Sequence, residues 1–244
     1  IVTSSPSIED AGWLSSEQGW LVSGNHLYWT NDRGKNWVDI SPAPIQLAYF
    51  LPSGQAWAIS NQSQGRVILY RSSNWGSTWE SLELTPPPDA WSSIQLHFTS
   101  PTTGWVVMQK DTSQAFNVGI LMKTIDGGLT WQTYDLPTAA KIYFTSQAEG
   151  WLLNYIMDES FRTTDGGFTW KTALPAEQLL FQPLLPESTI LSGWQGSELG
   201  WAATSMGACS GEKSTPNFTC QVNTAFWQTQ DGGTTWEAVP FPSR

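Results

Sequence analysis

The chain has 244 residues, of which 40% are hydrophobic and only 13% are charged. This composition provides enough apolar surface for a large core and lacks the charge excess of a disordered segment. The formal net charge is −10, which makes nucleic acid an unfavourable partner because its phosphate backbone is also anionic. No apolar run reaches the length of about eighteen residues that a membrane span requires, so we expect none here.

One short motif recurs five times along the chain. All copies fit the pattern Ser/Thr-x-Asp/Asn-x-Gly-x-Thr/Asn-Trp, and we call them the box segments. In chain order they occupy residues 30–37, 72–79, 124–131, 163–170 and 229–236. The last three share Thr-x-Asp-Gly-Gly-x-Thr-Trp. Repeats of this kind indicate an architecture built from one small module.

A second signal precedes every box segment: an aromatic residue stands seven positions before a tryptophan. The five pairs are Trp13 and Trp20, Phe50 and Trp57, Phe98 and Trp105, Phe144 and Trp151, and Trp194 and Trp201. The residue before the second tryptophan is always Gly or Ala. Most of the 16 tryptophans therefore occupy repeat positions, which chance does not explain.

Each repeat predicts four short β-strands bounded by turn residues. In the third repeat these are residues 94–98, ending at the aromatic residue, then 104–108, 119–123 and 131–134. Four-stranded modules of roughly forty to fifty residues are typical of propeller blades. We therefore predict one all-β domain over residues 1–244, a β-propeller of five four-stranded antiparallel blades. The blades are expected at residues 11–41, 46–84, 92–136, 140–174 and 188–240.

The box carboxylates are expected to be structural and not catalytic. An Asp or Asn side chain can accept hydrogen bonds from nearby backbone N–H groups and so define a turn. Asn74 replaces Asp in the second copy, which fits this role because an amide cannot act as a carboxylate base. We assign the turn role to Asp32, Asn74, Asp126, Asp165 and Asp231, and a packing role to Trp37, Trp79, Trp131, Trp170 and Trp236. The alternating acidic residues of a calcium loop are absent, so no metal ion or other cofactor is expected.

The string Arg162 to Trp170, together with Gly150-Trp151, resembles the BNR/Asp-box propellers of the photosystem II stability and assembly factor family. The resemblance covers nearly the whole chain. It implies a propeller fold with a binding or assembly role, and a protein as the partner. Those factors are similar in their module but have seven blades, whereas five modules are present here. Asp-boxes also occur in sialidases and sorting receptors, so the resemblance indicates fold more specifically than function.

Cys209 and Cys220 lie within a polar stretch that we expect to be a loop. A redox or metal-binding pair usually needs closer spacing or further Cys and His partners. We therefore predict a disulfide, which implies an oxidising, extracytoplasmic compartment. The chain begins at Ile1 without a signal peptide, and we expect a trimmed or mature form.

A sialidase-like glycoside hydrolase is the main enzymatic alternative. Such enzymes also need three arginines that converge on a substrate carboxylate. Two of the five arginines are poorly placed for this, because Arg33 lies inside a box segment and Arg244 is the last residue. The only histidines, His26 and His97, are expected at a hairpin turn and in the interior, so Ser-His-Asp chemistry is poorly supported. We therefore expect no enzymatic activity.

The loops between second and third strands are expected to gather on one face, opposite the box segments. They are longest in the fifth repeat, at residues 205–223, and in the third, at residues 110–117. Long loops on a rigid scaffold usually carry function. The predicted protein-binding residues on this loop face are Lys110, Asp111, Phe116, Tyr155, Asp158 and Glu159.

Two further hypotheses concern other surfaces. Arg71, Lys123 and Arg162 share the position just before the box hydroxyl and could form a basic stripe for an anionic partner. The alternative of a carbohydrate-binding lectin would use tryptophans outside the repeat positions as sugar-stacking platforms. These are Trp29, Trp75, Trp91 and Trp227.

Overall fold

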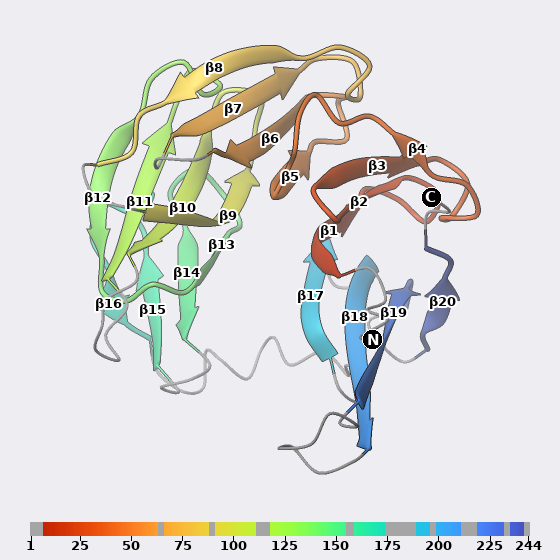
Figure 1. The fold of residues 1–244 in the computed structure, drawn as a ribbon. Coiled ribbons are helices and arrows are strands. Elements are labelled where there is room, and N and C mark those ends of the chain that lie inside the picture. Colours follow the sequence, from red (N-terminus) through yellow and green to blue (C-terminus); the bar gives the residue numbers. More distant parts are fainter. Residues whose placement is uncertain are drawn as a thin grey trace. The chain divides into compact units, whose positions relative to one another are not determined.

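The computed structural model describes residues 7–62, 66–87, 91–110, 118–154, 159–173, 189–195, 199–210, 219–231 and 235–241. Within these residues every regular element is a β-strand, and the strands form five four-stranded antiparallel sheets (Figure 1). The predicted fold class is confirmed: the chain is all-β, with five β-propeller blades. No helix in the described part has the length and apolar character needed to cross a bilayer.

Every blade contains four strands in chain order, each paired with the next. Blade 1 comprises β1 (Ile8–Trp13), β2 (Gly19–Ser23), β3 (His26–Thr30) and β4 (Val38–Asp39). Blade 2 comprises β5 (Leu47–Phe50), β6 (Ala56–Asn61), β7 (Val67–Ser72) and β8 (Glu80–Leu84). Blade 3 comprises β9 (Trp91–Phe98), β10 (Gly104–Lys110), β11 (Val118–Thr124) and β12 (Gln132–Leu136). Blade 4 comprises β13 (Lys141–Phe144), β14 (Gly150–Asn154), β15 (Glu159–Thr163) and β16 (Lys171–Thr172). Blade 5 comprises β17 (Thr189–Gln195), β18 (Leu199–Ser210), β19 (Thr219–Thr229) and β20 (Glu237–Val239).

The repeated residues mark the strand boundaries. The first strand ends at the aromatic residue in blades 1 to 4, and the third strand ends at the box hydroxyl in all five. The fourth strand begins directly after the box tryptophan. Because neighbouring strands are antiparallel, each box segment lies at the same end of its blade as the turn between the first and second strands. We call this the box end, and the opposite end, with the connection between second and third strands, the loop end.

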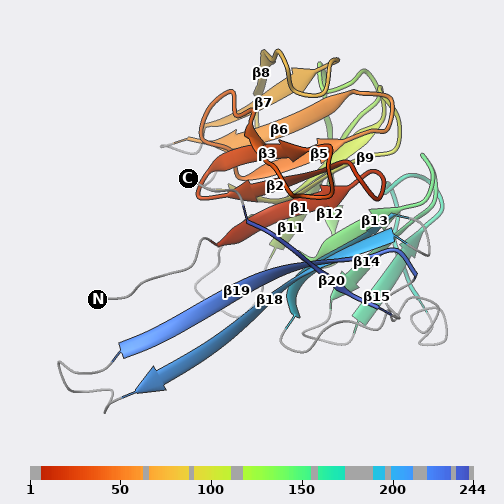
Figure 2. The same ribbon diagram turned by 90° about the vertical axis from the view of Figure 1, so that its right-hand side faces the viewer.

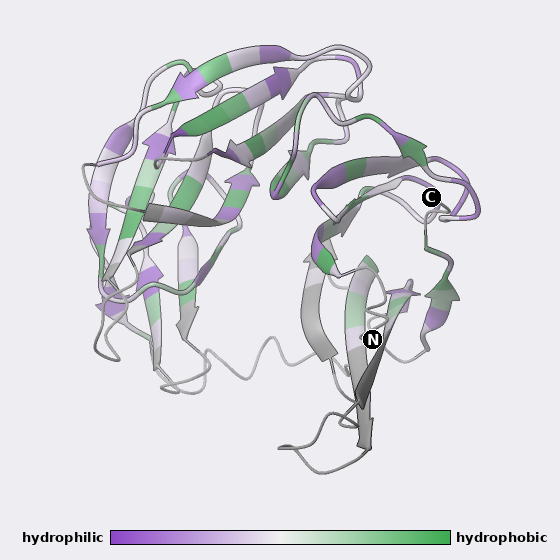
Figure 3. Ribbon diagram, viewed as in Figure 1, coloured by the Kyte–Doolittle hydropathy of each residue, from purple (hydrophilic) through white to green (hydrophobic). Residues whose placement is uncertain are grey.

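The described residues divide into two compact units. The three-blade unit, Pro42–Gln182, holds blades 2, 3 and 4. Its core lies between successive blades, where β5 packs on β9 and β9 packs on β13. In Figure 3 the hydrophobic segments of the unit are concentrated in its strands. The prediction of a single domain stays a prediction.

The two-blade unit, Ile1–Ser41 with Pro183–Arg244, holds the first and the last blade. Its core joins β1 of blade 1 to β17 and β18 of blade 5. Gly34 of the blade 1 box segment packs so tightly on Val239 of β20 that an added Cβ would lie 2.2 Å from Val239 Cγ1. The two ends of the chain are therefore held together by blade-on-blade packing.

The cysteine segment is not the loop that the sequence suggested. Residues 205–210 continue β18 and residues 219–223 belong to β19, so the connection expected as a loop is a long hairpin. Cys209 pairs in register with Cys220. The pairing continues the register that β18 and β19 have nearer the core, although Gly, Ala and Asn in this stretch have low intrinsic strand propensity.

Candidate functional site

The box segments share one hydrogen-bonding pattern. In blade 3, Thr124 Oγ1 donates to Asp126 Oδ1 over 2.8 Å and accepts from Gly128 N over 2.9 Å. Asp126 in turn accepts from the backbone N–H of Thr130 over 2.9 Å and from its hydroxyl over 2.5 Å. The carboxylates of Asp32, Asp165 and Asp231 make the equivalent bonds. Each carboxylate therefore ties together its own turn.

These hydrogen bonds also set the protonation of the carboxylates. Partial burial opposes ionisation of Asp126, but the hydrogen bonds from Thr130 and Thr124 outweigh it and lower its pKa to about 2. Asp165 has the same balance and a pKa of about 2. A carboxylate with so low a pKa stays ionised at neutral pH and is a poor general acid or base.

The amide of Asn74 reproduces the pattern in blade 2. Asn74 Oδ1 accepts from Thr78 N over 2.9 Å, and Asn74 Nδ2 donates to Thr78 Oγ1 over 2.9 Å. The direction of the second bond is reversed relative to the carboxylates, since an amide nitrogen donates where a carboxylate oxygen accepts. The turn thus needs an acceptor at Oδ1 and a partner for the second hydroxyl, and it does not need a negative charge.

The fourth residue of the box, directly after the Asp or Asn, adopts left-handed backbone geometry in every described copy. Gly127 and Gly166 have φ of 74° and 79°, whereas Arg33 and Trp75 hold the same geometry at 66° and 60°. A residue with a Cβ is strained there. The Gly-Gly copies therefore fit the turn best, and the sequence pattern alone did not reveal the strain in blades 1 and 2.

The box segments of blades 3 and 4 also lock these blades to their predecessors. Trp57 of β6 donates its indole N–H to the carbonyl of Gly127, in the next blade, over 3.0 Å. Its ring stacks on Phe98 with 3.6 Å between centroids and 5° between planes. Trp105 repeats the arrangement with Gly166 over 3.1 Å and with Phe144 at 3.8 Å and 7°. The paired aromatic signal in the sequence is thus an inter-blade contact, formed between the second strand of one blade and the first strand of the next.

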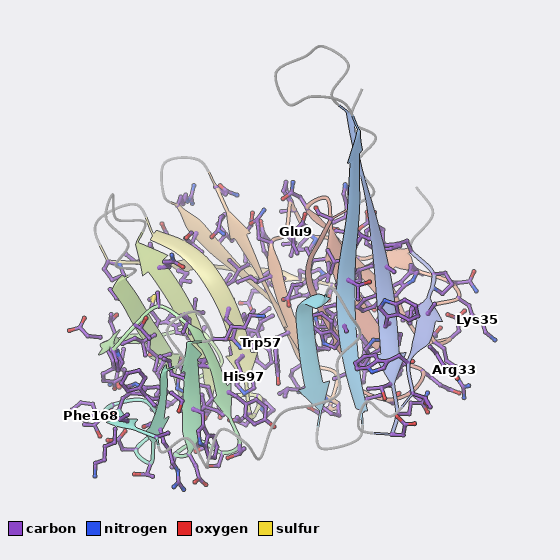
Figure 4. The ribbon with its side chains drawn as sticks, turned by 90° about the horizontal axis from the view of Figure 1, so that it is seen from below. Glu9, Arg33, Lys35, Trp57, His97 and Phe168 are labelled. Carbon is purple, nitrogen blue, oxygen red and sulfur yellow. The ribbon has the colours of Figure 1, made fainter. Side chains whose placement is uncertain are left out.

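The first strands of the three-blade unit carry a buried polar cluster. His97 Nε2 lies 3.2 Å from the carbonyl oxygen of Phe144, and the amide of Gln95 bonds the backbone N–H and C=O of Ile142 over 2.7 and 2.8 Å. Burial lowers the pKa of His97 to about 4, so the ring is neutral and Nε2 donates. Trp57 and His97 both point into the interior of the unit (Figure 4). The rings near His97 belong to Tyr49, Trp105, Tyr143 and Phe144, so His97 links blade 3 to blades 2 and 4.

Most of the predicted binding residues lie outside the part of the chain that the structure describes. Asp111, Phe116, Tyr155 and Asp158 lie outside the described residues. Lys110 and Glu159 are described by their backbone alone, at the loop ends of β10 and β15, as are Cys209 and Cys220 in blade 5. These residues, and the disulfide, stay predictions.

The basic stripe is not available as a free anion site. Arg71 pairs with Glu80 over 2.8 Å, and Arg162 pairs with Glu149 while lying 5.5 Å from the Trp151 ring. Lys123 lies 5.7 Å from the ring centroid of Trp105, and burial lowers its pKa against the attraction of Asp165. Each cation is held across a strand or blade junction, so its charge is already compensated.

His26, Asp39 and Ser41 contain the residue types of a hydrolase triad in the wrong order. His26 Nδ1 lies 2.7 Å from Asp39 Oδ2, and Ser41 donates its hydroxyl to Asp39 Oδ1 over 2.6 Å. The carboxylate therefore separates the hydroxyl from the imidazole, whereas nucleophilic catalysis needs the imidazole beside the hydroxyl. Among the described residues, no group of three or more His, Cys, Asp and Glu is placed to hold a metal ion.

Three large apolar side chains are exposed at the box end of the three-blade unit. Ile125, Leu129 and Phe168 have exposed fractions of 68%, 57% and 65%. Phe168 packs edge-on against Tyr134 with 5.4 Å between ring centroids, and it lies at the surface in Figure 4. The box pattern leaves these positions variable, so the sequence did not single them out.

Comparison with solved structures agrees with the fold described above. YCF48 from Cyanidioschyzon merolae is 14% identical with a TM-score of 0.51, and the match covers 100% of this chain and 88% of that one. The GH74 enzyme of Niastella koreensis is 11% identical with a TM-score of 0.55, covering 98% of this chain and 46% of the enzyme. The likeness is one of fold. This chain spans less than half of the GH74 enzyme. The sequence matches no protein-family model and no curated protein.

Proposed function

We propose that the chain is a non-enzymatic, extracytoplasmic scaffold that binds or assembles other proteins through the loop end of its blades. The observation that carries this proposal is the contrast between the two ends. At the box end, the box carboxylates already accept hydrogen bonds from their own turns. At the loop end, blade 5 extends β18 and β19 well beyond its two other strands. Because β17 and β20 do not accompany this extension, its backbone edges are available for binding.

The resemblance to the photosystem II assembly factor family supports an assembly role, and the fold likeness to YCF48 is compatible with it. We carry over the general role and not photosystem II itself. The in-register placement of Cys209 and Cys220 supports a disulfide and hence an oxidising compartment. The partner is proposed to be a protein, with no nucleic acid and no cofactor involved.

The lectin alternative has weaker support. A sugar-stacking platform needs an open indole face, but Trp29, Trp75 and Trp227 are each partly buried. Trp227 Nε1 donates to Thr204 Oγ1 over 3.0 Å, and the Trp75 ring covers Gly54. The side chain of Trp91 lies outside the description.

Partner capture tests the proposal. The full chain would be immobilised and incubated with cell-envelope extract, beside a variant in which Asn-Gly replaces residues 206–223. We expect the shortened variant to lose a specific captured protein and an Asp126→Asn box variant to keep it. Equal capture by all three proteins would overturn the proposal. Cleavage of a fluorogenic sialoside, or binding on a glycan array, would favour the enzymatic or lectin reading instead.

A further inference from the structure

The long hairpin of blade 5 ends in a two-stranded ribbon. β18 pairs with β19 without a register shift from Gly200↔Thr229 to Ser210↔Thr219. β17 accompanies β18 only as far as Thr204, and β20 accompanies β19 only as far as Phe226. The remaining strands, residues 205–210 and 219–225, form what we call the ribbon, which runs on past the rest of its sheet in Figure 2.

The pairing of β20 with β19 ends at Val239, which lies opposite Phe226. The next residue, Pro240, accepts the indole N–H of Trp37 at its carbonyl over 2.9 Å. Within the described residues, no strand pairs with the edge of β19 beyond this point.

The equivalence of the blades shows which backbone groups face this edge. Ile40 N donates to Leu27 O in blade 1, and Ala173 N donates to Ser160 O in blade 4. Both acceptors stand three residues before the box hydroxyl, as Phe226 does in blade 5. The backbone groups of Phe226 therefore face β20. Because the facing alternates along a strand, those of Thr224, Val222 and Cys220 face the same, uncovered side.

The edge lacks the features that prevent strand addition. Natural edge strands are blunted by charged side chains or by proline. Residues 219–225, Thr-Cys-Gln-Val-Asn-Thr-Ala, contain neither. A row of outward N–H and C=O groups is matched by the backbone of another extended polypeptide.

The charges at this end of the two-blade unit are negative. Glu9 and Asp10 lie at the loop end of blade 1, where Asp39 is paired with His26, whereas Arg33 and Lys35 lie at its box end. Figure 4 shows Glu9 toward the ribbon and both cations away from it. The described lysines and arginines of this unit are these two. The net charge of −10, with Glu9 and Asp10 at this end of the unit, favours a partner segment that carries basic residues and disfavours a second copy of this chain.

We propose, building on the scaffold function above, that the open edge of β19 at residues 219–225 binds an extended, basic-flanked segment of a partner protein as an added strand. The side chains of the segment alternate along the ribbon faces, and its backbone pairs with Cys220, Val222 and Thr224.

The test uses the full chain and a labelled peptide, Lys-Lys-Thr-Val-Thr-Val-Thr-Val-Thr-Lys-Lys, with a glutamate-flanked copy as control. Fluorescence anisotropy is expected to give saturable binding of the lysine peptide and at least roughly tenfold weaker binding of the glutamate peptide. Hydrogen exchange shows which backbone amides of β19 the peptide covers. In the free chain the amides of Val222 and Thr224 exchange fast and those of Gln221 and Asn223 slowly, and the lysine peptide protects the fast pair.

Val222→Pro removes one outward N–H and leaves the bonds to β18 in place, since that N–H does not face β18. We expect it to weaken the lysine peptide by roughly tenfold, while Val222→Thr binds as the parent does. Slow exchange at Gln221 in Val222→Pro confirms that the ribbon still forms. No binding by the parent, or equal binding by Val222→Pro, overturns the proposal.

A concentration-dependent dimer that Val222→Pro abolishes would also overturn it, because a second copy would then occupy the edge. Analytical ultracentrifugation of both proteins detects this. The scaffold function is tested separately. If the lysine peptide does not bind but the shortened-hairpin variant still loses its captured protein, the ribbon binds that protein by another mode.

Discussion

At the scale of single residues, an acidic side chain in this protein acts as a hydrogen-bond acceptor inside a turn. Asp126 holds Thr130 from two sides, and Thr124 holds both Asp126 and Gly128. Blade 2 makes the same turn with Asn74. Because Asp126 and Asn74 form the same turn, the turn requires a hydrogen-bond acceptor at this position and does not require a negative charge.

Asp126→Asn is therefore expected to cost less stability than Asp126→Ala. The amide can copy Asn74, whereas alanine leaves the N–H of Thr130 without its acceptor, a loss comparable to removing a helix cap, about 1 kcal/mol. Urea denaturation of both variants measures the free energy of unfolding. Equal losses would show that the charge matters and that the comparison with Asn74 fails.

His97 should make the stability depend on pH. Its pKa falls from an ordinary 6.5 to about 4 in the folded chain, so the unfolded chain binds a proton that the folded chain does not. The stability contribution is complete above pH 6.5 and is lost as the pH falls toward 4, by up to about 3 kcal/mol. In His97→Gln, which keeps a donor for the Phe144 carbonyl, this dependence of the free energy of unfolding on pH should disappear. Urea midpoints at several pH values test it, and an unchanged slope would assign the effect to other groups.

At the scale of elements, a buried tryptophan of the second strand joins each blade of the three-blade unit to the next one. The indoles of Trp57 and Trp105 each combine a stacked ring with a hydrogen bond to the following box segment. Both indoles are fully buried. The box tryptophan Trp131 instead donates to Gly128 of its own turn and is only partly buried.

Trp105→Phe should therefore destabilise the chain more than Trp131→Phe. The first substitution leaves the buried carbonyl of Gly166 without its donor and opens a cavity between two blades, for a loss of about 2–4 kcal/mol. The second disturbs a single turn near the surface. Thermal unfolding of the two variants makes the comparison, and a larger effect at Trp131 would refute the inter-blade role.

At the scale of the whole molecule, the last blade packs on the first. Gly34 packs on Val239, and Trp37 donates to Pro240. These contacts join residues far apart in the sequence, so forming them costs chain entropy that local turns do not incur. They are the way in which the two termini enter one core.

Ending the chain at Trp236 removes β20 together with both contacts. We expect amides of β1–β4 to lose more protection from hydrogen exchange than amides of β9–β16, because the deleted strand packs on blade 1. Mass-spectrometric exchange on the two proteins resolves the two regions. A uniform loss across the chain would mean that β20 stabilises the whole fold equally.

Much of the fold could be predicted because the signals that define a blade are local. Strand ends, the box turn and its hydroxyl–carboxylate bonding involve residues a few positions apart, and their types follow from turn chemistry. The fold class, the strand boundaries and the interior position of His97 were therefore accessible from the sequence. The hairpin of blade 5 was wrongly expected as a loop, because its residues have little intrinsic strand propensity and the pairing that extends β18 and β19 is not visible in a local pattern.

The sequence by itself determined that this chain repeats one four-stranded unit with an internally bonded turn, since each turn closes on its own residues. Only the tertiary structure decided that the tryptophans Trp57 and Trp105 bond the next blade, that Gln95 and His97 link first strands, and that the edge of β19 stays open. Those contacts join residues that lie 47 to 70 positions apart, or depend on where a neighbouring strand stops. A local pattern carries no information about such distances, because the packing of whole blades creates them.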